Sequence, residues 1–432
     1  MNISEVKMIQ YSKSEEVFNI KLLQSGTETS IGLKTKTFSI AMRKSAHTSL
    51  VKMHNHTTLL VIYPSSGLFT FNDLSNKIID KIFKYIRKGE KMNKISSRIH
   101  TLDYLRGFAL LGIILVNVVG INFINAEIAK THIEGIYASF LLIFIESKFF
   151  SIFSILFGVG FYIFMDRATY KAQNKYALYF RRLIVLFIFG VLHSFLQPGE
   201  ALKFYAIAGV LLLIFLHLKK EINLILGLLL LVVAIVLDAK LLETMPYFIL
   251  GLAIGQYGLI YQFNTNLRKW IIAWSVFLVL TILSVSLLMM YYAPPNYILA
   301  ENMGLHGEQF VQKKMFFDHL VTMTSPFISC FYMLTIIIVV QNDIGAKLLA
   351  PLKYYGRMAL TNYIFQTLFI IVFVKVFFNG SVSMLNSLLM CLIIYSIQIM
   401  FSVIWLKYFK YGPLEYLWRV ATYLKVLPFK SV

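Results

Sequence analysis

The sequence predicts an all-α, polytopic integral membrane protein with about ten transmembrane helices, and three observations support this fold class. Of the 432 residues, 58% are hydrophobic and 15% are aromatic. The mean hydropathy of +0.70 lies outside the range of soluble globular proteins. Long apolar runs recur throughout the chain after residue 100, and short basic clusters separate them. This alternation is typical of proteins that cross a membrane many times.

Ten apolar runs approach the roughly 20 residues that a membrane-spanning helix needs. They cover residues 105–126, 149–165, 183–197, 202–218, 222–237, 246–260, 270–292, 321–340, 358–378 and 385–406. The further apolar segment 137–145 is too short to span by itself, so it either lies in the interface or extends the second helix. Segment 293–320 is the largest predicted outer loop, and it serves either as a solvated connection or as a lid over an acceptor.

Basic residues predict the orientation of these helices. The net charge is +20, but the bases cluster between apolar runs, which favours a membrane protein over one that binds nucleic acid. One set of alternate loops carries twelve basic residues and the other set carries six, and the basic C-terminal tail lies on the richer side. The positive-inside rule then places both termini in the cytoplasm of a bacterial cell with an inner-membrane location. An even number of helices, such as ten, is required for this arrangement.

Residues 1–91 differ in kind from the transmembrane domain predicted for residues 92–432. They show no apolar periodicity and no signal peptide, so we expect either an unstructured cytoplasmic extension or an over-extended reading frame that should begin at Met92. Cys330 and Cys391 both lie in apolar runs, which predicts no disulfide framework. We expect no metal site.

The first apolar run carries three polar residues that are candidates for a function. Asp103 and Arg106 are spaced to pair on one helical face, and Gly107 allows another backbone to approach closely. Asn117 follows about 16 Å deeper, at 1.5 Å per residue. Polar groups in lipid are functional candidates by default. The alternatives are that the charged pair anchors the helix at the interface and that Asn117 holds two helices together.

Two histidines are candidates for a catalytic base. His193 lies near the outer end of the third predicted helix, and Glu200 follows seven residues later. An imidazole beside an acid can act as a general base, although a histidine in a membrane helix can also simply bond two helices together. His132 in the first outer loop is the second candidate.

The ninth predicted helix and the cytoplasmic helix ends supply candidate binding residues. Asn362 and Gln366 share one helical face, and Arg357 precedes them. The first, third and ninth helices begin near Arg106, near Arg181 with Arg182, and near Arg357. Arginines at helix N-termini can bind phosphates such as those of coenzyme A. The positive-inside rule alone also produces basic inner rims, and composition does not distinguish the two interpretations.

Several motifs together resemble the YeiB-like bacterial membrane family, which carries domain of unknown function 418. They are LDYLRGFALLGIILVN, FFSIFSILFGVGF, RRLIVLFIFGVLHSFL with PGEALKFYAIAG, YYGRMALTNYIFQ and the closing YGPLEYLWR, and they span residues 98–422. The resemblance implies an all-helical membrane domain. The family usually has aspartate where this chain has Glu200.

The first helix is also similar to that of the transmembrane acyltransferase superfamily, including the lysosomal heparan-glucosaminide acetyltransferases. That resemblance implies transfer of an acyl group from cytosolic coenzyme A to a sugar across the membrane, and it maps the catalytic asparagine to Asn117. The spacing of the catalytic histidine departs from the pattern, with His132 the nearest residue. The base therefore stays unassigned.

These observations favour a transmembrane acyltransferase that uses acyl-CoA and acts on an envelope or exported, sugar-containing acceptor. Asp103 and Arg106 would form the donor mouth, Asn117 would orient the thioester or the base, and His193 with Glu200 would activate the acceptor. The expected partners are membrane lipid and an envelope glycan or lipid-linked acceptor. The alternatives are a transporter of a small solute and a structural membrane protein. The sequence shows no Gly- or Pro-broken helices at matching positions in two halves, which weakens the transporter hypothesis.

Overall fold

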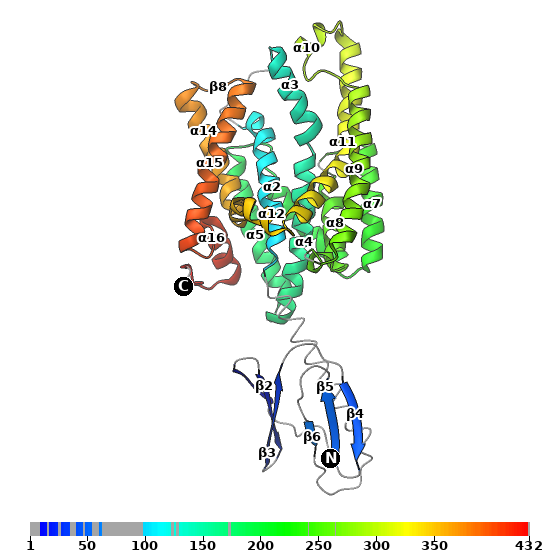
Figure 1. Ribbon diagram of the computed structural model, residues 1–432. Helices are drawn as coiled ribbons and strands as arrows, with labels where there is room; N and C mark the ends of the chain where they lie inside the picture. The colour runs from blue at the N-terminus through cyan, green and yellow to red at the C-terminus, as the bar shows by residue number, and fades with distance from the viewer. Residues whose placement is uncertain are drawn as a thin grey trace. The chain divides into compact units, whose positions relative to one another are not determined.

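Helices make up nearly all of the secondary structure described after residue 97 in the computed structural model (Figure 1). The structure describes residues 98–121, 125–126, 129–171, 174–240, 242–263 and 265–430, together with six strands closer to the N-terminus. The chain divides into two units, Met1–Lys88 and Gly89–Val432.

The six N-terminal strands form two three-stranded antiparallel sheets. The first sheet has the order β1–β2–β3 and the second has the order β4–β5–β6. The strands are β1 (Ile9–Ser14), β2 (Val17–Gln24), β3 (Thr27–Lys34), β4 (Ile40–Ser45), β5 (Thr48–Met53) and β6 (Leu60–Ile62). Translation from Met92 stays a prediction.

The second unit is a bundle of helices. In chain order these are α2 (His100–Asn117), η2 (Val118–Gly120), α3 (His132–Phe140), η3 (Leu141–Ile145), α4 (Lys148–Lys171), α5 (Lys175–Ser194), α6 (Leu202–Phe215), α7 (Lys220–Val236), α8 (Thr244–Gln256), η4 (Leu259–Tyr261), α9 (Leu267–Met290), α10 (Tyr297–Glu301), α11 (Gly307–Val339), α12 (Asp343–Leu348), α13 (Ala350–Arg357), α14 (Ala359–Phe377), α15 (Met384–Tyr408) and α16 (Pro413–Tyr423). Two short strands, β7 (Asn125–Ala126) and β8 (Ser381–Val382), pair in parallel.

Each of the ten predicted apolar runs falls on a helix of this unit. Six helical segments of the described chain are both long and apolar enough to cross a membrane. They are His132–Thr169, Lys175–Ser194, Leu267–Met290, Gly307–Val339, Ala359–Phe377 and Met384–Tyr408. The prediction of an all-α integral membrane protein is therefore confirmed, whereas the number ten stays a prediction.

Three features near the helix ends differ from or refine the prediction. The segment 137–145 extends the second helix, because α3, η3 and α4 follow one another within a helical stretch of 38 residues. Part of the outer loop expected at 293–320 is helical, since α10 lies within it and α11 begins at Gly307. Lys148, one of the six basic residues of the predicted outer loops, has no exposed surface and donates to the carbonyl of Leu142 at 3.1 Å.

Two of the long helices are interrupted. The π-helical η3 ends at Ile145, Ser147 follows with a positive φ of 64°, and Pro326 lies inside α11. The two irregular regions touch, because the Ser329 hydroxyl donates to the carbonyl of Lys148 at 3.0 Å. Interrupted helices are therefore present. Only one of these two interruptions contains a proline, so prolines do not occur at matching positions of two halves.

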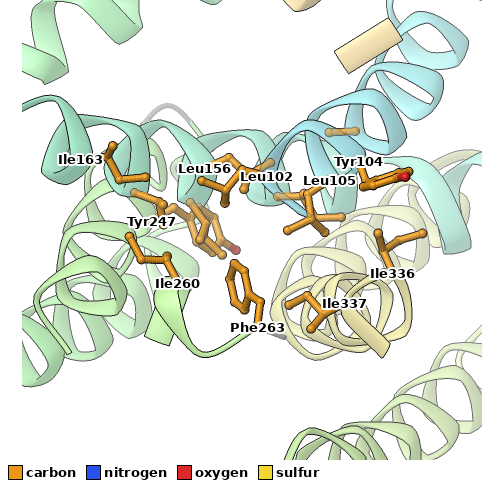
Figure 2. Close-up of a cluster of buried hydrophobic side chains, with 14 of the residues drawn as sticks. Leu102, Tyr104, Leu105, Leu156, Ile163, Tyr247, Ile260, Phe263, Ile336 and Ile337 are labelled. Carbon is orange, nitrogen blue, oxygen red and sulfur yellow. The ribbon is translucent and has the colours of Figure 1, made fainter. Parts of the chain in front are cut away.

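The central helix α2 is buried by its neighbours because its apolar residues face several helices. Leu102 and Leu105 of α2 pack with Leu156 of α4 and with Ile336 and Ile337 of α11 in one hydrophobic cluster (Figure 2). Burying an aliphatic side chain of this size stabilises the fold by about 1.5–3 kcal/mol when water is the reference, and less when lipid is. This packing fixes the position of α2, and α2 in turn positions the polar residues near its start.

The segments that the charge bias assigns to the outside gather at one end of the bundle. Figure 1 shows α3, α10 and β8 at one end and α16 with the C-terminus toward the other. This distribution agrees with an in–out alternation of the helices along the chain.

Candidate functional site

A buried carboxylate near the start of α2 is held by two arginines. Asp103 has 1% of its surface exposed and accepts hydrogen bonds from Arg98 Nε at 2.6 Å and Nη2 at 2.9 Å. Arg106 Nη1 lies 3.3 Å from Oδ1, the same carboxylate oxygen that accepts from Arg98 Nη2, and this pairing agrees with the predicted spacing. Two guanidinium groups share one carboxylate, so the cluster keeps a net positive charge.

A backbone crossing brings Arg357 to this cluster. A side chain at Gly356 of α13 would place its Cβ 1.9 Å from the carbonyl oxygen of Asp103, and one at Gly107 would lie 2.2 Å from the carbonyl of Leu352. Glycine at both positions lets α2 and α13 touch through their backbones. Each glycine is next to an arginine, Arg106 or Arg357, so the crossing places both arginines around Asp103.

These residues line a cavity of about 540 Å³ between α2, α4, α5, α13 and α16. Its lining includes seven basic side chains and two carboxylates: Arg98, Arg106, Arg167, Arg182, Arg357, Lys410, Arg419, Asp103 and Glu415. Aromatic and aliphatic side chains cover its inner part, among them Phe153, Phe157, Leu202, Tyr205 and Tyr363. The cavity therefore has a strongly cationic part and a mainly apolar part, which suits a ligand with a polyanionic head and an apolar or extended tail.

Two aromatic rings, Trp418 on α16 and Tyr411 just before it, hold two of the basic groups in place. The guanidinium carbon of Arg182 lies 3.7 Å from the ring centre of Trp418, whose indole nitrogen donates to the carbonyl of Arg182 at 2.8 Å. Arg419 lies over the ring of Tyr411 at 4.5 Å. Stacking orders a guanidinium while leaving its N–H groups free to bind an anion.

Glu415 fastens α16 to the first turn of α14. Its carboxylate accepts hydrogen bonds from the backbone N–H of Leu360 at 2.7 Å, from that of Thr361 at 3.1 Å and from the Thr361 hydroxyl at 2.6 Å. Burial raises the pKa of Glu415, and these hydrogen bonds oppose that rise. Burial likewise lowers the pKa of Arg357, and the nearby Arg98 adds to the effect. These hydrogen bonds of Glu415 hold the side of the cavity formed by Trp418 and Arg419 next to the side formed by Arg357.

His193 and Glu200 form a buried pair at the far end of α5. The Nδ1 atom of His193 and the Oε2 atom of Glu200 share a hydrogen bond, and neither side chain has exposed surface. Nε2 of His193 lies 2.9 Å from the Thr367 hydroxyl of α14. Glu200 also accepts a hydrogen bond from the backbone N–H of Leu202. The acid thus orients the imidazole, as in sites where a histidine serves as a general base.

Tyr363 connects this pair with the cavity. Its side chain lines the cavity, its hydroxyl donates to Glu200 Oε2 at 3.3 Å, and its ring lies 5.2 Å from the imidazole. Along α5, His193 is about 16 Å from Arg182, at 1.5 Å per residue. The cationic part and the histidine are therefore linked through one tyrosine.

The other predicted site residues lie elsewhere. Asn117 is the last residue of α2, is half-buried, and does not belong to the cavity lining. His132 lies exposed at the first position of α3, and Arg181 is exposed beside Arg182. The structure brings Arg106, Arg182 and Arg357 to one cavity, but it does not bring Asn117 or His132 there.

The two predicted amides of α14 are buried and do not line the cavity. Asn362 donates to the carbonyl of Tyr355 at 3.0 Å and to the Ser402 hydroxyl of α15 at 2.9 Å. Gln366 is buried, and its Oε1 has no hydrogen-bond partner among the described residues. The observed contacts of Asn362 are those of a residue that joins two helices.

We expect replacement of Asn362 by alanine to destabilise the protein by about 0.5–2 kcal/mol, because two interhelical hydrogen bonds are lost in a membrane bundle. Binding of coenzyme A should change less than twofold. Thermal unfolding in detergent and isothermal binding measurements check these two expectations. A loss of coenzyme A binding at unchanged stability would mean that Asn362 belongs to the ligand site after all.

The contributors to the cavity that were missed from the sequence include Arg98, Arg167, Trp418 and Tyr363. Arg98 is in reach of Asp103 at a separation of five residues, and this pairing was detectable from the sequence. Trp418 and Tyr363 reach the cavity through contacts between distant helices, which local patterns do not reveal. In the described part of the chain, no group of three or more metal-ligating residues is placed to hold a metal ion.

Comparisons with known proteins place the chain in a family. Residues 255–425 match the family described as "Protein of unknown function (DUF418)". The chain is 44% identical over 339 residues to an "Uncharacterized 39.9 kDa protein in amylase 3'region" of Bacillus acidopullulyticus, covering 77% of this chain and 96% of that protein. It is 28% identical over 399 residues to YxaH of Bacillus subtilis, with the same two coverages. It is also 41% identical over 80 residues to YeiB of Escherichia coli, which covers 18% of this chain and 20% of that protein. The chain belongs to the YeiB-like family of DUF418 membrane proteins.

Proposed function

We propose that the protein is a membrane-bound acyltransferase that takes an acyl group from cytosolic acyl-CoA and transfers it to a sugar-containing acceptor of the cell envelope. This proposal rests on one cavity. Seven basic side chains line it, and its wall at Tyr363 lies beside the buried His193–Glu200 pair. The basic cluster suits the phosphates of coenzyme A, because arginines bind phosphate through paired N–H groups. The tail of the donor would then extend along the apolar part toward Tyr363.

The chemistry assigned to the pair is proton removal from the acceptor. When Nδ1–H of His193 donates to Glu200, Nε2 is the basic nitrogen, and it can take the proton of an acceptor hydroxyl. The acceptor oxygen attacks the thioester carbon, the new C–O bond forms, and the C–S bond breaks. The proton from the acceptor passes by way of His193 to the departing thiolate, so charge and atoms balance. Asn117 remains a candidate to orient the thioester carbonyl or the base.

A direct experiment incubates the purified full chain in lipid nanodiscs with acetyl-CoA or palmitoyl-CoA and with lipid-linked sugars from the cell envelope as the acceptor. The proposal predicts release of coenzyme A, measured with a thiol reagent. Gly160→Leu serves as the occluded control, because a side chain at Gly160 points toward Arg106 with Nη2 as its nearest neighbour at 3.7 Å. This variant should remain folded and lose coenzyme A release. A protein that transports a solute would leave both thioesters intact, and that result would remove the acyltransferase proposal.

Arg106→Lys tests the donor mouth. Lysine keeps the charge but lacks the planar fork that binds phosphate with two N–H groups. We expect the dissociation constant for coenzyme A to rise about tenfold, equivalent to about 1.4 kcal/mol, with normal membrane insertion. If Arg106 only anchors α2 at the interface, lysine replaces it equally well and binding stays unchanged.

We further propose an inner-membrane location with both termini in the cytoplasm, on the basis of the basic-loop count. A green fluorescent protein fused after Val432 should fluoresce, and alkaline phosphatase at the same position should be inactive. Phosphatase activity there would reverse the orientation and would place the basic cavity on the outer side.

A further inference from the structure

Tyr363 lies between the basic cavity and the buried histidine. It is 5% exposed and belongs to the cavity lining, while neither His193 nor Glu200 does. Leu202, whose backbone N–H binds Glu200, lines the cavity as well. The acid therefore lies directly behind two residues of the cavity wall.

The contacts of Tyr363 with the pair are of two kinds. Its hydroxyl donates to Glu200 Oε2 at 3.3 Å, which is long for a bond between two oxygens. Its ring packs against the imidazole of His193 with a centroid distance of 5.2 Å and an angle of 67° between the planes. The ring covers the side of the histidine that the cavity could otherwise reach.

The pair does not depend on Tyr363 for its own geometry. Glu200 is held by His193 and by the backbone N–H of Leu202, and Nε2 of His193 lies against the Thr367 hydroxyl. Movement of the Tyr363 ring would break its long hydrogen bond to Glu200 and its hydrogen bond with the backbone of Ala201, and would remove it from the buried apolar cluster that includes Leu202 and Leu360. The three contacts that hold the pair would stay in place. The hydrogen bond to Glu200 contributes about 1.5 kcal/mol or less in a folded protein, so the cost of moving the ring lies mainly in its packing.

We propose that Tyr363 is a gate between the basic cavity and the His193–Glu200 pair, and that withdrawal of its ring admits the thioester end of a phosphate-bearing donor to the pair. The assignment of the donor rests on the proposed acyltransferase function. The gate itself rests on the contacts of Tyr363 and has a test that needs no enzymatic activity. Tyr363 is thus a positioning residue, which acts through His193 and Glu200.

The test measures how fast diethyl pyrocarbonate modifies His193 in the full chain in nanodiscs, followed by peptide mass spectrometry. In the unchanged protein His193 should react slowly, because the ring and the helices bury it. Tyr363→Ala should increase the rate at least tenfold, and Tyr363→Leu should give an intermediate rate. Tyr363→Phe should stay within about threefold of the unchanged protein, because the ring remains and only the hydrogen bonds of its hydroxyl are lost.

Two controls separate a gate from general loosening. Phe164→Ala removes a cavity-lining ring that packs on Arg182, about 16 Å along α5 from His193, and it should leave His193 protected. Cys391 is fully buried and should stay unreactive toward a maleimide in every folded variant. If Tyr363→Ala makes Cys391 reactive as well, that variant is loosened in general, and the rate of His193 modification in Tyr363→Leu then decides whether Tyr363 is a gate.

The outcomes distinguish the gate from the proposed function. Equal rates of His193 modification in the unchanged protein and in the folded Tyr363 variants would overturn the gate, even if acyl-CoA is consumed. Consumption of no acyl-CoA would overturn the acyltransferase proposal, while faster modification of His193 in Tyr363→Ala would still establish the gate. In an active enzyme, Tyr363→Phe should lower kcat by about tenfold and should change the KM for acetyl-CoA less than twofold, because Tyr363 lies away from the basic residues.

Discussion

Replacing Gly356 by alanine should separate α2 from α13 and abolish the basic cavity. The added methyl group would lie 1.9 Å from the carbonyl oxygen of Asp103 and 2.5 Å from the backbone nitrogen of Gly107. Both contacts are with backbone atoms, so no side chain can turn away to make room. Overpacking of a core typically destabilises by about 1–3 kcal/mol, and we expect this variant at or above the top of that range. Binding of coenzyme A should be lost, because Arg106 and Arg357 both depend on the crossing.

The thermal unfolding midpoint in detergent and the dissociation constant for coenzyme A check this expectation. Gly107→Ala should behave in the same way, since its methyl group would lie 2.2 Å from the carbonyl of Leu352 on the same crossing. Gly120→Ala is the matched control, because nothing lies within 4 Å of its added Cβ. A Gly356→Ala protein that unfolds and binds like the unchanged one would mean that the two helices do not cross through their backbones.

Much of the helical framework was predictable because membrane-spanning helices are specified locally. Each predicted apolar run coincides with a helix, since a long stretch without charges has few other stable forms in lipid. Contacts between residues that are close in the sequence were predictable for the same reason. The Asp103–Arg106 pair needs only a separation of three residues on one helix.

The features that were missed depend on the tertiary fold. Lys148 appears in the sequence as a loop base, but the helix interruption before it turns it into the bundle and buries it. The amphipathic helix α16 was expected as a basic tail, yet Glu415 anchors it on the first turn of α14. These placements depend on which helices become neighbours, and periodicity within one helix does not contain that information.

The candidate site shows the same division. The sequence indicated that arginines gather at the cytoplasmic helix ends, and three of those named line one cavity. It also paired His193 with Glu200, whose contact the structure contains. It did not indicate that Asn362 binds α15, that Asn117 lies outside the cavity, or that Tyr363 joins the cavity to the histidine. These distinctions require knowing the direction of each side chain.

Replacing His193 by glutamine should lower kcat for acyl transfer by about 10²–10⁴-fold, which is the usual contribution of a general base. Glutamine retains hydrogen-bonding groups toward Glu200 and Thr367 but has no nitrogen that accepts a proton at neutral pH. The KM for acetyl-CoA should change little, because the basic residues proposed to hold the donor line the cavity, which His193 does not. Steady-state kinetics with the purified protein in nanodiscs provide both values.

Two comparisons make this result specific to His193. His132→Gln changes the exposed histidine at the start of α3, the other candidate base, and should leave kcat unchanged. Asn223→Ala removes a buried polar side chain that bonds α7 to the carbonyl of Phe215 and to Gln256, away from the cavity lining, and should reduce stability without reducing kcat. A large loss of kcat in His132→Gln with none in His193→Gln would transfer the base to His132.

The double variant His193→Gln/Glu200→Gln shows whether the pair acts as one unit. If Glu200 serves catalysis by orienting the imidazole, its removal adds nothing once the imidazole is gone, and the double variant should be no slower than His193→Gln. If the two residues instead stabilise the helix contacts independently, their effects on the unfolding free energy should add and kcat should follow the amount of folded protein. A non-additive kcat at additive or unchanged stability is therefore the result that identifies His193 and Glu200 as a catalytic pair.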